Sequence, residues 1–386
     1  NPHPHDGIAS VVLEFFGRFK PLFSKAEHEN LALFILGLLS DTRNKTVAGL
    51  ARLDALKDHT ILSKFLQKRN TGQVFRILRE MFFERVNWTQ TTYFYLDDTL
   101  KEKTGKKVRA EYNYSSTHNK TVLSNCFVIG LAKNNGFSLP FDFAKYFQNA
   151  CPFKSKLDLA ESMMRSFLRW IKPGARVVFV FDSWYACKQI VKFIRSANAF
   201  FITRLKSNRK IHASKQRGKQ SLEEYAATLG RGVFKKIKLE NGKSYYAYSE
   251  VFSVNKVGVV KVVFTRKRKH ARKTVFLATN DLNMKEHEVI EQYGARWGIE
   301  QFFKDLKGEF GFDEYQDVRQ LAVSRHITLS FASYSLTALV KIFLEEMRKM
   351  PLTVKGALEK IRESLCEVKW VLLARLFRRK IKNAIH

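Results

Sequence analysis

The sequence has few cysteines and lacks the common histidine motif for zinc, and these absences exclude several kinds of site. None of its four cysteines forms a CxxC pair, so neither a zinc site nor a disulfide framework is expected. Histidines at HExxH spacing are also absent. Free thiols suit a reducing compartment, and no signal peptide is visible, so we expect a cytoplasmic protein.

Acidic residues are scarce beside basic ones. Lys and Arg number 68 and Asp and Glu 36, which gives a formal net charge of +32. Such an excess favours a nucleic acid partner, because each neutralised phosphate releases a condensed counterion. The longest apolar stretch, 327–343, is interrupted by hydroxyl side chains and Lys341, which predicts a buried helix. No basic amphipathic anchor dominates, so no membrane partner is expected.

Hydrophobic periodicity divides the chain into helical ends and a mixed centre. In the centre, strands come first and then alternate with helices, which is typical of a mixed α/β sheet flanked by helices. The expected regions are 1–88 (helical), 89–204 (first part of the α/β core), 205–282 (β-rich insertion), 283–345 (second part of the core) and 346–386 (helical).

Within the first helical region, two short segments fit a DNA-reading unit. A helix-turn-helix formed by residues 46–51 and 61–66 is one interpretation. A plain helical support explains them equally well, because no recognition helix stands out. Both interpretations stay open at this point.

Two aspartates are expected at strand ends. Asp97 follows the strand-like run 91–96, and Asp182 follows the apolar run 177–181. Carboxylates at strand ends point into the crevice where α/β sheets place their chemistry. A carboxylate there is costly unless a cation compensates it.

A third carboxylate lies on a predicted helix over 284–307, capped by Asn283 and ended by Gly308. Spacings of three and four residues place one mixed stripe on one face of this helix. The stripe consists of Tyr293, Arg296, Glu300, Lys304 and Lys307. The alternative is an ordinary exposed face with ion pairs such as Glu300–Lys304.

Asp97, Asp182 and Glu300 together form an oxygen-only ligand set. Such a set suits Mg²⁺, with Mn²⁺ as a substitute. Two such ions about 4 Å apart activate an attacking oxygen and stabilise a leaving one in phosphoryl transfer. The three residues are therefore the candidate catalytic and metal-binding residues.

Residues 293–307 match the signature Tyr-x2-Arg-x3-Glu-x6-Lys. This signature resembles that of the DDE transposases of bacterial insertion-sequence family four, whose relatives include the transposases of transposons five and ten. The run Asp97-Asp98-Thr99 resembles the Asp-x-Thr that carries the first aspartate of the family, and Phe179–Asp182 resembles the strand that carries the second. The β-rich stretch before Glu300 is similar to the insertion of that family. The resemblance covers residues of about 90 to 330.

The resemblance implies a ribonuclease-H-like fold, namely a mixed sheet with flanking helices, interrupted by a β-rich insertion. It also implies that Asp97, Asp182 and Glu300 form the metal-binding triad, with Asp98 as the alternative to Asp97. Further implied DNA contacts come from Tyr293, Arg296 and Lys307 to phosphates and from Lys304 and Trp297 to the transposon end. Trp297 fits the core equally well.

A basic cluster in the insertion is a further candidate for contact with the DNA backbone, the alternative being a solvated turn. It consists of Arg266, Lys267, Arg268 and Lys269. The predicted activity is cleavage at transposon ends followed by strand transfer into target DNA. Terminal inverted repeats, target DNA and a homodimer in a synaptic complex are the expected partners, on the nucleoid of a bacterium. Alternatives are a ribonuclease-H-like nuclease without strand transfer and a non-catalytic DNA-binding descendant.

Overall fold

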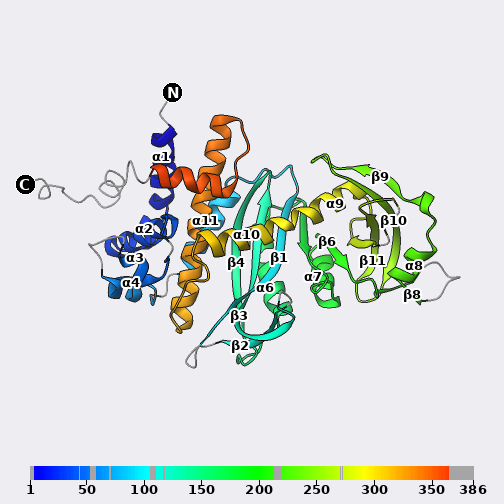
Figure 1. The fold of residues 1–386 in the computed structure, drawn as a ribbon, viewed down its shortest axis with the longest axis horizontal. Helices are drawn as coiled ribbons and strands as arrows, with labels where there is room; N and C mark the ends of the chain where they lie inside the picture. Colours follow the sequence, from blue (N-terminus) through cyan, green and yellow to red (C-terminus); the bar gives the residue numbers. More distant parts are fainter. Residues whose placement is uncertain are drawn as a thin grey trace, which may run out of the picture.

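One long mixed sheet runs through the middle of the molecule (Figure 1). The computed structural model describes residues 4–364 apart from residues 43, 53–57, 69–70, 105–109, 116–117, 213–218, 270 and 272. Across these residues the strand order is β2-β3-β1-β5-β6-β12-β11-β10-β7-β8, with β4 on β3 and β9 on β10.

The first half of the sheet combines antiparallel and parallel pairs. β1 is antiparallel to β3 and parallel to β5, and β6 continues the parallel part. All five residues of β5 are buried, as expected of a strand covered on both faces. The bounds are β1 (Thr92–Glu102), β2 (Glu111–Ser115), β3 (Lys120–Asn134), β4 (Phe137–Tyr146), β5 (Val177–Phe181) and β6 (Phe200–Leu205).

Two features of this half differ from expectation. Asp97 is not at the end of its strand, because β1 continues to Glu102 along its antiparallel partner β3. Hydrogen bonds to β3 keep residues 98–102 of β1 in the strand, although several of them are polar residues with weak strand propensity. β4 is a strand that the sequence did not predict, since Pro140 and Asp142 disfavour one. It pairs with β3 at the sheet edge across a register shift at Gly130/Leu131, where proline is tolerated.

The second half of the sheet contains the strands predicted between 205 and 282. They continue the same sheet, because β12 pairs antiparallel with β6. β11 and β10 follow as a long hairpin. The elements are β7 (Lys210–His212), β8 (Lys219–Ser221), α8 (Leu222–Thr228), η2 (Arg231–Val233), β9 (Lys235–Lys238), β10 (Ser244–Val254), β11 (Gly258–Arg266) and β12 (Val275–Thr279).

Helices cover both faces of the first half of the sheet. On one face, α6 (Lys156–Leu168) packs against β3 and β4, and α7 (Lys188–Ser196) against β6. On the other face, the ring of Phe143 meets Phe331 of α11 (Gln320–Arg348). Successive residues of a strand alternate between these two faces, which decides what each side chain of β1 can reach.

The N-terminal region is helical, as predicted, and α2 and α5 pack against α11 (Figure 1). The most apolar window of α11 is 83% buried inside the protein, so this helix is a core helix, as predicted, although its length and composition would also suit a membrane span. The N-terminal elements are α1 (Pro4–Gly17), η1 (Lys20–Leu22), α2 (Lys25–Leu39), α3 (Val47–Ala51), α4 (His59–Phe65) and α5 (Thr71–Phe83). Residues 354–364 form a further helix, and residues 365–386 lie outside the described part.

The single helix predicted over 284–307 is wrong. The chain forms α9 (Glu286–Ala295) and α10 (Trp297–Glu309), with a tight turn at Arg296. The N–H of Arg296 bonds to the carbonyl of Tyr293, three residues back, at 3.1 Å. The predicted cap residues are also wrong: Lys285 precedes α9 in place of Asn283, and α10 continues past Gly308.

Candidate active site

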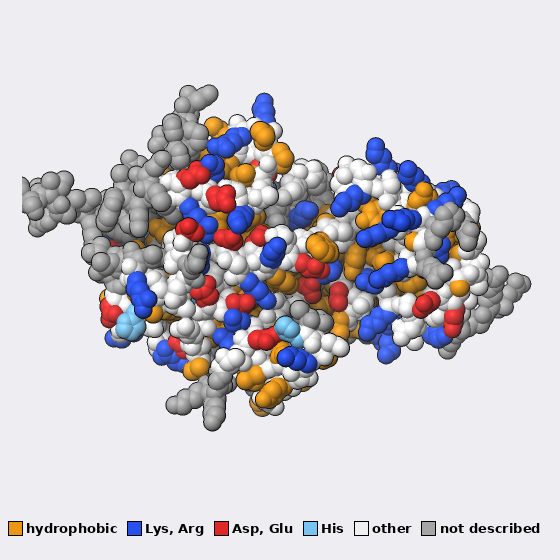
Figure 2. Space-filling view, in the orientation of Figure 1, with side chains coloured by type: hydrophobic (Ala, Val, Ile, Leu, Met, Phe, Trp, Pro, Cys, Tyr) orange, Lys and Arg blue, Asp and Glu red, His pale blue; other side chains and the backbone are white. Residues whose placement is uncertain are grey.

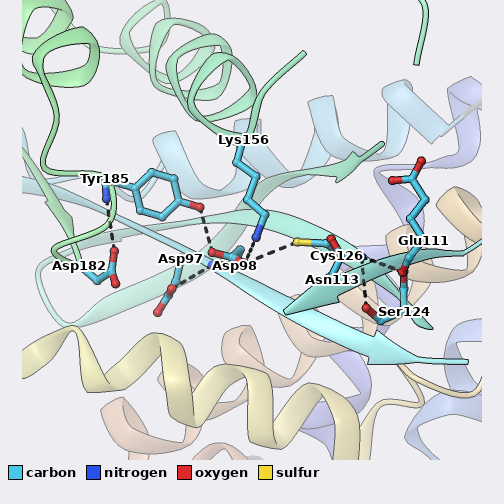
Figure 3. Close-up of polar contacts among 9 residues, drawn as sticks. All are labelled: Asp97, Asp98, Glu111, Asn113, Ser124, Cys126, Lys156, Asp182 and Tyr185. Atoms are coloured by element: carbon cyan, nitrogen blue, oxygen red, sulfur yellow. Dashed lines mark hydrogen bonds and ion pairs between the residues drawn. The ribbon is translucent and has the colours of Figure 1, made fainter. Parts of the chain in front are cut away.

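Asp97 and Asp182 lie side by side where β5 ends (Figure 3). β1 and β5 are parallel, and Leu96 pairs with Phe181. The residue that follows each of these two paired residues is one of the two aspartates. Neighbouring strands lie only about 4.8 Å apart. The register of one parallel pair therefore brings together two carboxylates that are distant in the sequence.

Backbone N–H groups orient both aspartates. Oδ1 of Asp182 accepts from the N–H of Trp184 at 2.9 Å and of Tyr185 at 3.4 Å. Oδ1 of Asp97 accepts from the N–H of Asp98 at 2.9 Å. The turn after β5 thus orients Asp182 through two backbone N–H groups.

Arg296 connects the helical layer to these strands. Its Nη1 donates to Oδ2 of Asp97 at 2.7 Å, and its Nη2 donates to Oε1 of Glu300 at 2.6 Å. Asp97 and Glu300 therefore share one guanidinium, which lies between them. The turn between α9 and α10 is the feature that places Arg296 there.

Burial disfavours the ionised form of both aspartates. Burial raises the pKa of Asp97 to about 7, Arg296 opposes this shift, and the charges of Asp182 and Asp98 add to it. Burial also raises the pKa of Asp182, against the donated N–H groups of Trp184 and Tyr185. Groups of this kind bind a cation readily, because a positive charge offsets both the desolvation and the mutual repulsion.

Asp98 points to the opposite face of β1. Its Oδ2 accepts from Nζ of Lys156, the first residue of α6, at 2.7 Å. Its Oδ1 accepts from the hydroxyl of Tyr185 at 3.3 Å, and the thiol of Cys126 lies 3.5 Å from Oδ2 (Figure 3). Asp98 is thus neutralised from the α6 side, whereas Asp97 faces Arg296.

Family comparisons identify the group to which the chain is related. The family model described as DDE superfamily endonuclease matches residues 15–236, which is more than half of the chain. The chain belongs to this family. A second model, described as transposase DDE domain, matches residues 155–336. The chain is therefore a DDE-type transposase or endonuclease, as the sequence predicted at this coarser level.

A solved structure supports the fold. The chain is similar to the piggyBac transposase in a cryo-EM structure of its synaptic complex with hairpin DNA, with a TM-score of 0.51. The alignment covers 94% of this chain and 74% of that one at 9% identity, so the likeness concerns the fold alone. The predicted ribonuclease-H-like fold, with a mixed sheet and flanking helices, is confirmed. A comparison with curated protein sequences found no match.

The predicted DNA-contacting residues of the Tyr-Arg-Glu-Lys region lie along α9 and α10. Trp297 is 70% exposed, so the alternative that it belongs to the core is wrong. Lys304 is exposed as well. Tyr293 lies under the Arg296 guanidinium, 5.6 Å from ring centre to Cζ. Lys307 donates to the carbonyl of Leu100 at 3.0 Å, which ties α10 to β1.

The predicted basic cluster divides into two parts. Arg266 stacks on the ring of Phe234 at 3.9 Å and donates to Thr274, so it holds the hairpin together. Residues 267–269 are exposed beyond the end of β11.

Figure 2 shows Lys and Arg side chains gathered over β9 and β10, where sequence analysis singled out none. The exposed lysines of β9 are Lys235, Lys236 and Lys238.

Across the described residues, no three His, Cys, Asp or Glu side chains converge closely enough to hold a metal ion. The guanidinium of Arg296 takes the position between Asp97 and Glu300. The ligand chemistry nevertheless fits a hard divalent ion, because the two carboxylates offer only oxygen ligands. Burial raises the pKa of Asp97 to about 7, the charge of Asp182 adds to this shift, and a bound cation would offset both effects.

Sequence analysis missed Lys156 and Tyr185, which complete the surroundings of the aspartates. Tyr185 follows Asp182 by three residues, and this short spacing was the one signal available. Lys156 had no such signal, because it lies 58 residues from its partner Asp98. Its position as the first residue of α6 follows from the Ser155–Asp158 capping box, but its contact depends on the packing of α6.

Proposed function

We propose that the protein is a transposase related to insertion-sequence family four, which cleaves DNA at transposon ends and transfers the released 3′ hydroxyl to target DNA. The observation that carries the proposal is the adjacency of Asp97 and Asp182 at the end of β5, with Glu300 joined to Asp97 through Arg296. Two strand-borne carboxylates facing a helical one suit phosphoryl transfer.

Asp97, Asp182 and Glu300 would hold the divalent ions, Mg²⁺ or Mn²⁺. When bound, such ions activate the attacking oxygen and stabilise the leaving oxygen of an in-line displacement. Asp97 is favoured over Asp98 because Lys156 and Tyr185 already bind the Asp98 carboxylate on the other face of β1.

The residues of the chain contribute orientation and charge. The N–H groups of Trp184 and Tyr185 hold Asp182 in one rotamer. Arg296, 13% exposed in its side chain, supplies a positive charge beside the reacting phosphate and opposes the rise in the pKa of Asp97. Hydrolysis and strand transfer are both displacements at a phosphodiester, so one set of carboxylates can serve both steps.

The exposed residues around this centre would bind the DNA. Trp297 and Lys304 on α10 would meet the transposon end, and residues 267–269 the phosphate backbone. Two ends must be held together, so we propose a homodimer on DNA. Its place of action would be the nucleoid in a bacterial cytoplasm, and α3 and α4 remain candidates for a DNA-reading unit.

The test is a cleavage and strand-transfer assay on a duplex that carries the terminal inverted repeat beside the gene, with Mg²⁺ or Mn²⁺. We expect metal-dependent cutting at the repeat boundary and joining to a second DNA. Asp182→Asn and Glu300→Gln should abolish both steps and leave DNA binding intact, whereas Glu346→Gln, an exposed carboxylate on α11, should act as wild type. Cutting without joining would indicate a nuclease, and binding without cutting a non-catalytic DNA-binding protein.

A further inference from the structure

An aromatic and basic surface borders the aspartates on the α6 side of β1. Its members come from the end of β4, the β4–α6 connection, the start of α6 and the turn after β5. They are Tyr146, Phe153, Lys154, Lys156 and Trp184, called here the aromatic–lysine surface. None of their side chains belongs to the triad proposed above, although the backbone N–H of Trp184 orients Asp182.

The members of this surface contact one another. Nζ of Lys156 lies 5.6 Å from the ring centre of Trp184 and 5.7 Å from that of Tyr146. The rings of Tyr146 and Phe153 meet edge to face at 6.3 Å. One ammonium group therefore lies between two aromatic side chains, and a third ring continues the row.

Much of the aromatic area faces solvent. Phe153 is 55% exposed and Trp184 48% exposed, and Lys154 is exposed between Phe153 and α6. The ring of Tyr185 packs edge to face against the ring of Trp184, with 4.9 Å between the ring centres and an interplanar angle of 79°. Single exposed apolar residues are ordinary, but several exposed rings that contact one another and an ammonium group are a feature of binding surfaces.

Two contacts connect this surface to the aspartates. The N–H of Trp184 donates to Asp182. Lys156 pairs with Asp98, the residue after Asp97 (Figure 3). The surface therefore begins at the turn that orients Asp182, because Trp184 is only two residues after this aspartate.

We propose that the aromatic–lysine surface binds one or two unstacked nucleotides of the DNA strand next to the bond that is cleaved. This inference rests on the proposed function and names the form of DNA that the site accepts. A base offers its face to an aromatic ring only when it is outside the duplex stack, and such stacking is tolerant of sequence. The exposed Lys154 supplies positive charge for the phosphates between those bases, whereas the ammonium group of Lys156 is paired with Asp98.

The experiment compares a blunt duplex with the same duplex carrying a short oligo-thymidine overhang at its 3′ or its 5′ end. Binding is measured by fluorescence anisotropy with the full chain, in EDTA so that no cleavage occurs. The wild type should prefer one overhang duplex over the blunt one. Trp184→Ala should lose that preference, a change of roughly 5- to 150-fold in affinity for the loss of stacking on one base.

Control variants separate stacking from folding. Trp184→Phe keeps a ring and should retain most of the preference, and Phe153→Ala should weaken it. Tyr114→Ala removes a more exposed ring, on β2, whose hydroxyl bonds to Asn119, and it should change nothing. If Trp184→Ala fails to fold, photo-crosslinking of wild type to 5-iododeoxyuridine in the overhang decides, with adducts expected at Trp184, Tyr146 or Phe153.

The outcomes are distinguishable from those of the proposed function. A wild type that binds blunt and overhang duplexes equally, or crosslinks outside this surface, overturns the inference even if the protein cleaves transposon ends. A change in self-association with unchanged DNA affinity in Trp184→Ala also overturns it, in favour of a protein partner. Failure to bind any duplex would refute the proposed function itself.

Discussion

Replacing Arg296 by Met tests the charge balance of the site. The Arg296 side chain is 13% exposed and that of Asp97 19%, and their oxygen and nitrogen atoms lie 2.7 Å apart. Met keeps much of the volume and removes the charge, so Asp97 is left buried beside Asp182 without its cation. Removing one partner from a buried ion pair costs about 3–5 kcal/mol.

Two details set where in that range the result should fall. Glu300 is 40% exposed, so losing its contact with Arg296 should add little. Among the described residues, Nε of Arg296 has no hydrogen-bond partner although it is buried. Removing this unsatisfied donor is stabilising and offsets part of the loss from the broken ion pair. We therefore expect a loss of about 3 kcal/mol in the free energy of unfolding, measured by urea denaturation without divalent ions.

Added Mg²⁺ should recover part of this loss in Arg296→Met, because a ligand that binds only the folded state stabilises it. The double variant Arg296→Met with Asp97→Asn should show no such recovery. As a matched control, Arg165→Met breaks the more exposed pair with Glu161 and should change stability by less than about 0.5 kcal/mol. A loss below about 1 kcal/mol in Arg296→Met would refute the view that Arg296 compensates buried carboxylate charge.

Three further outcomes are expected. Burial lowers the pKa of His326 to about 4, below its unfolded value of about 6.5, so its contribution to stability is complete above pH 6.5 and is lost as pH falls toward 4. His326→Gln should therefore reduce the stability difference between pH 7 and pH 5 by about 2 kcal/mol in urea titrations; an unchanged difference would mean that another group titrates. Gly130→Ala should cost about 1–3 kcal/mol, because its Cβ would lie 2.2 Å from Cζ of Phe94, while Gly72→Ala, in open space on α5, should be neutral or stabilising; equal effects would contradict this packing. Alanine at all three residues of 267–269 should lower the slope of log affinity against log salt by about 2–3, and a slope equal to that of wild type would place these residues outside the DNA contact.

Much of the architecture could be predicted because local patterns dominate it. Burial on both faces makes β5 a continuous apolar run, and residues 156–168 show a helical period behind a capping box. The strands between 205 and 282 also follow from alternating β-branched and aromatic residues. The breaks from expectation occur where a partner element overrides propensity, as β3 does when it extends β1 to Glu102.

The sequence by itself determined which chemical groups are present: an excess of basic side chains, two aspartates after apolar runs and a Tyr-Arg-Glu-Lys spacing over residues 293–307. These are properties of composition and of the local order of residues, so the sequence alone is enough to identify them. Only the tertiary structure decided that Asp97 and Asp98 face opposite layers, with Arg296 on one and Lys156 on the other. The pleat alternates the side chains of β1 between the two faces of the sheet. The parallel register aligns β1 with β5 by pairing residues 85 positions apart, such as Leu96 and Phe181, which no local pattern encodes.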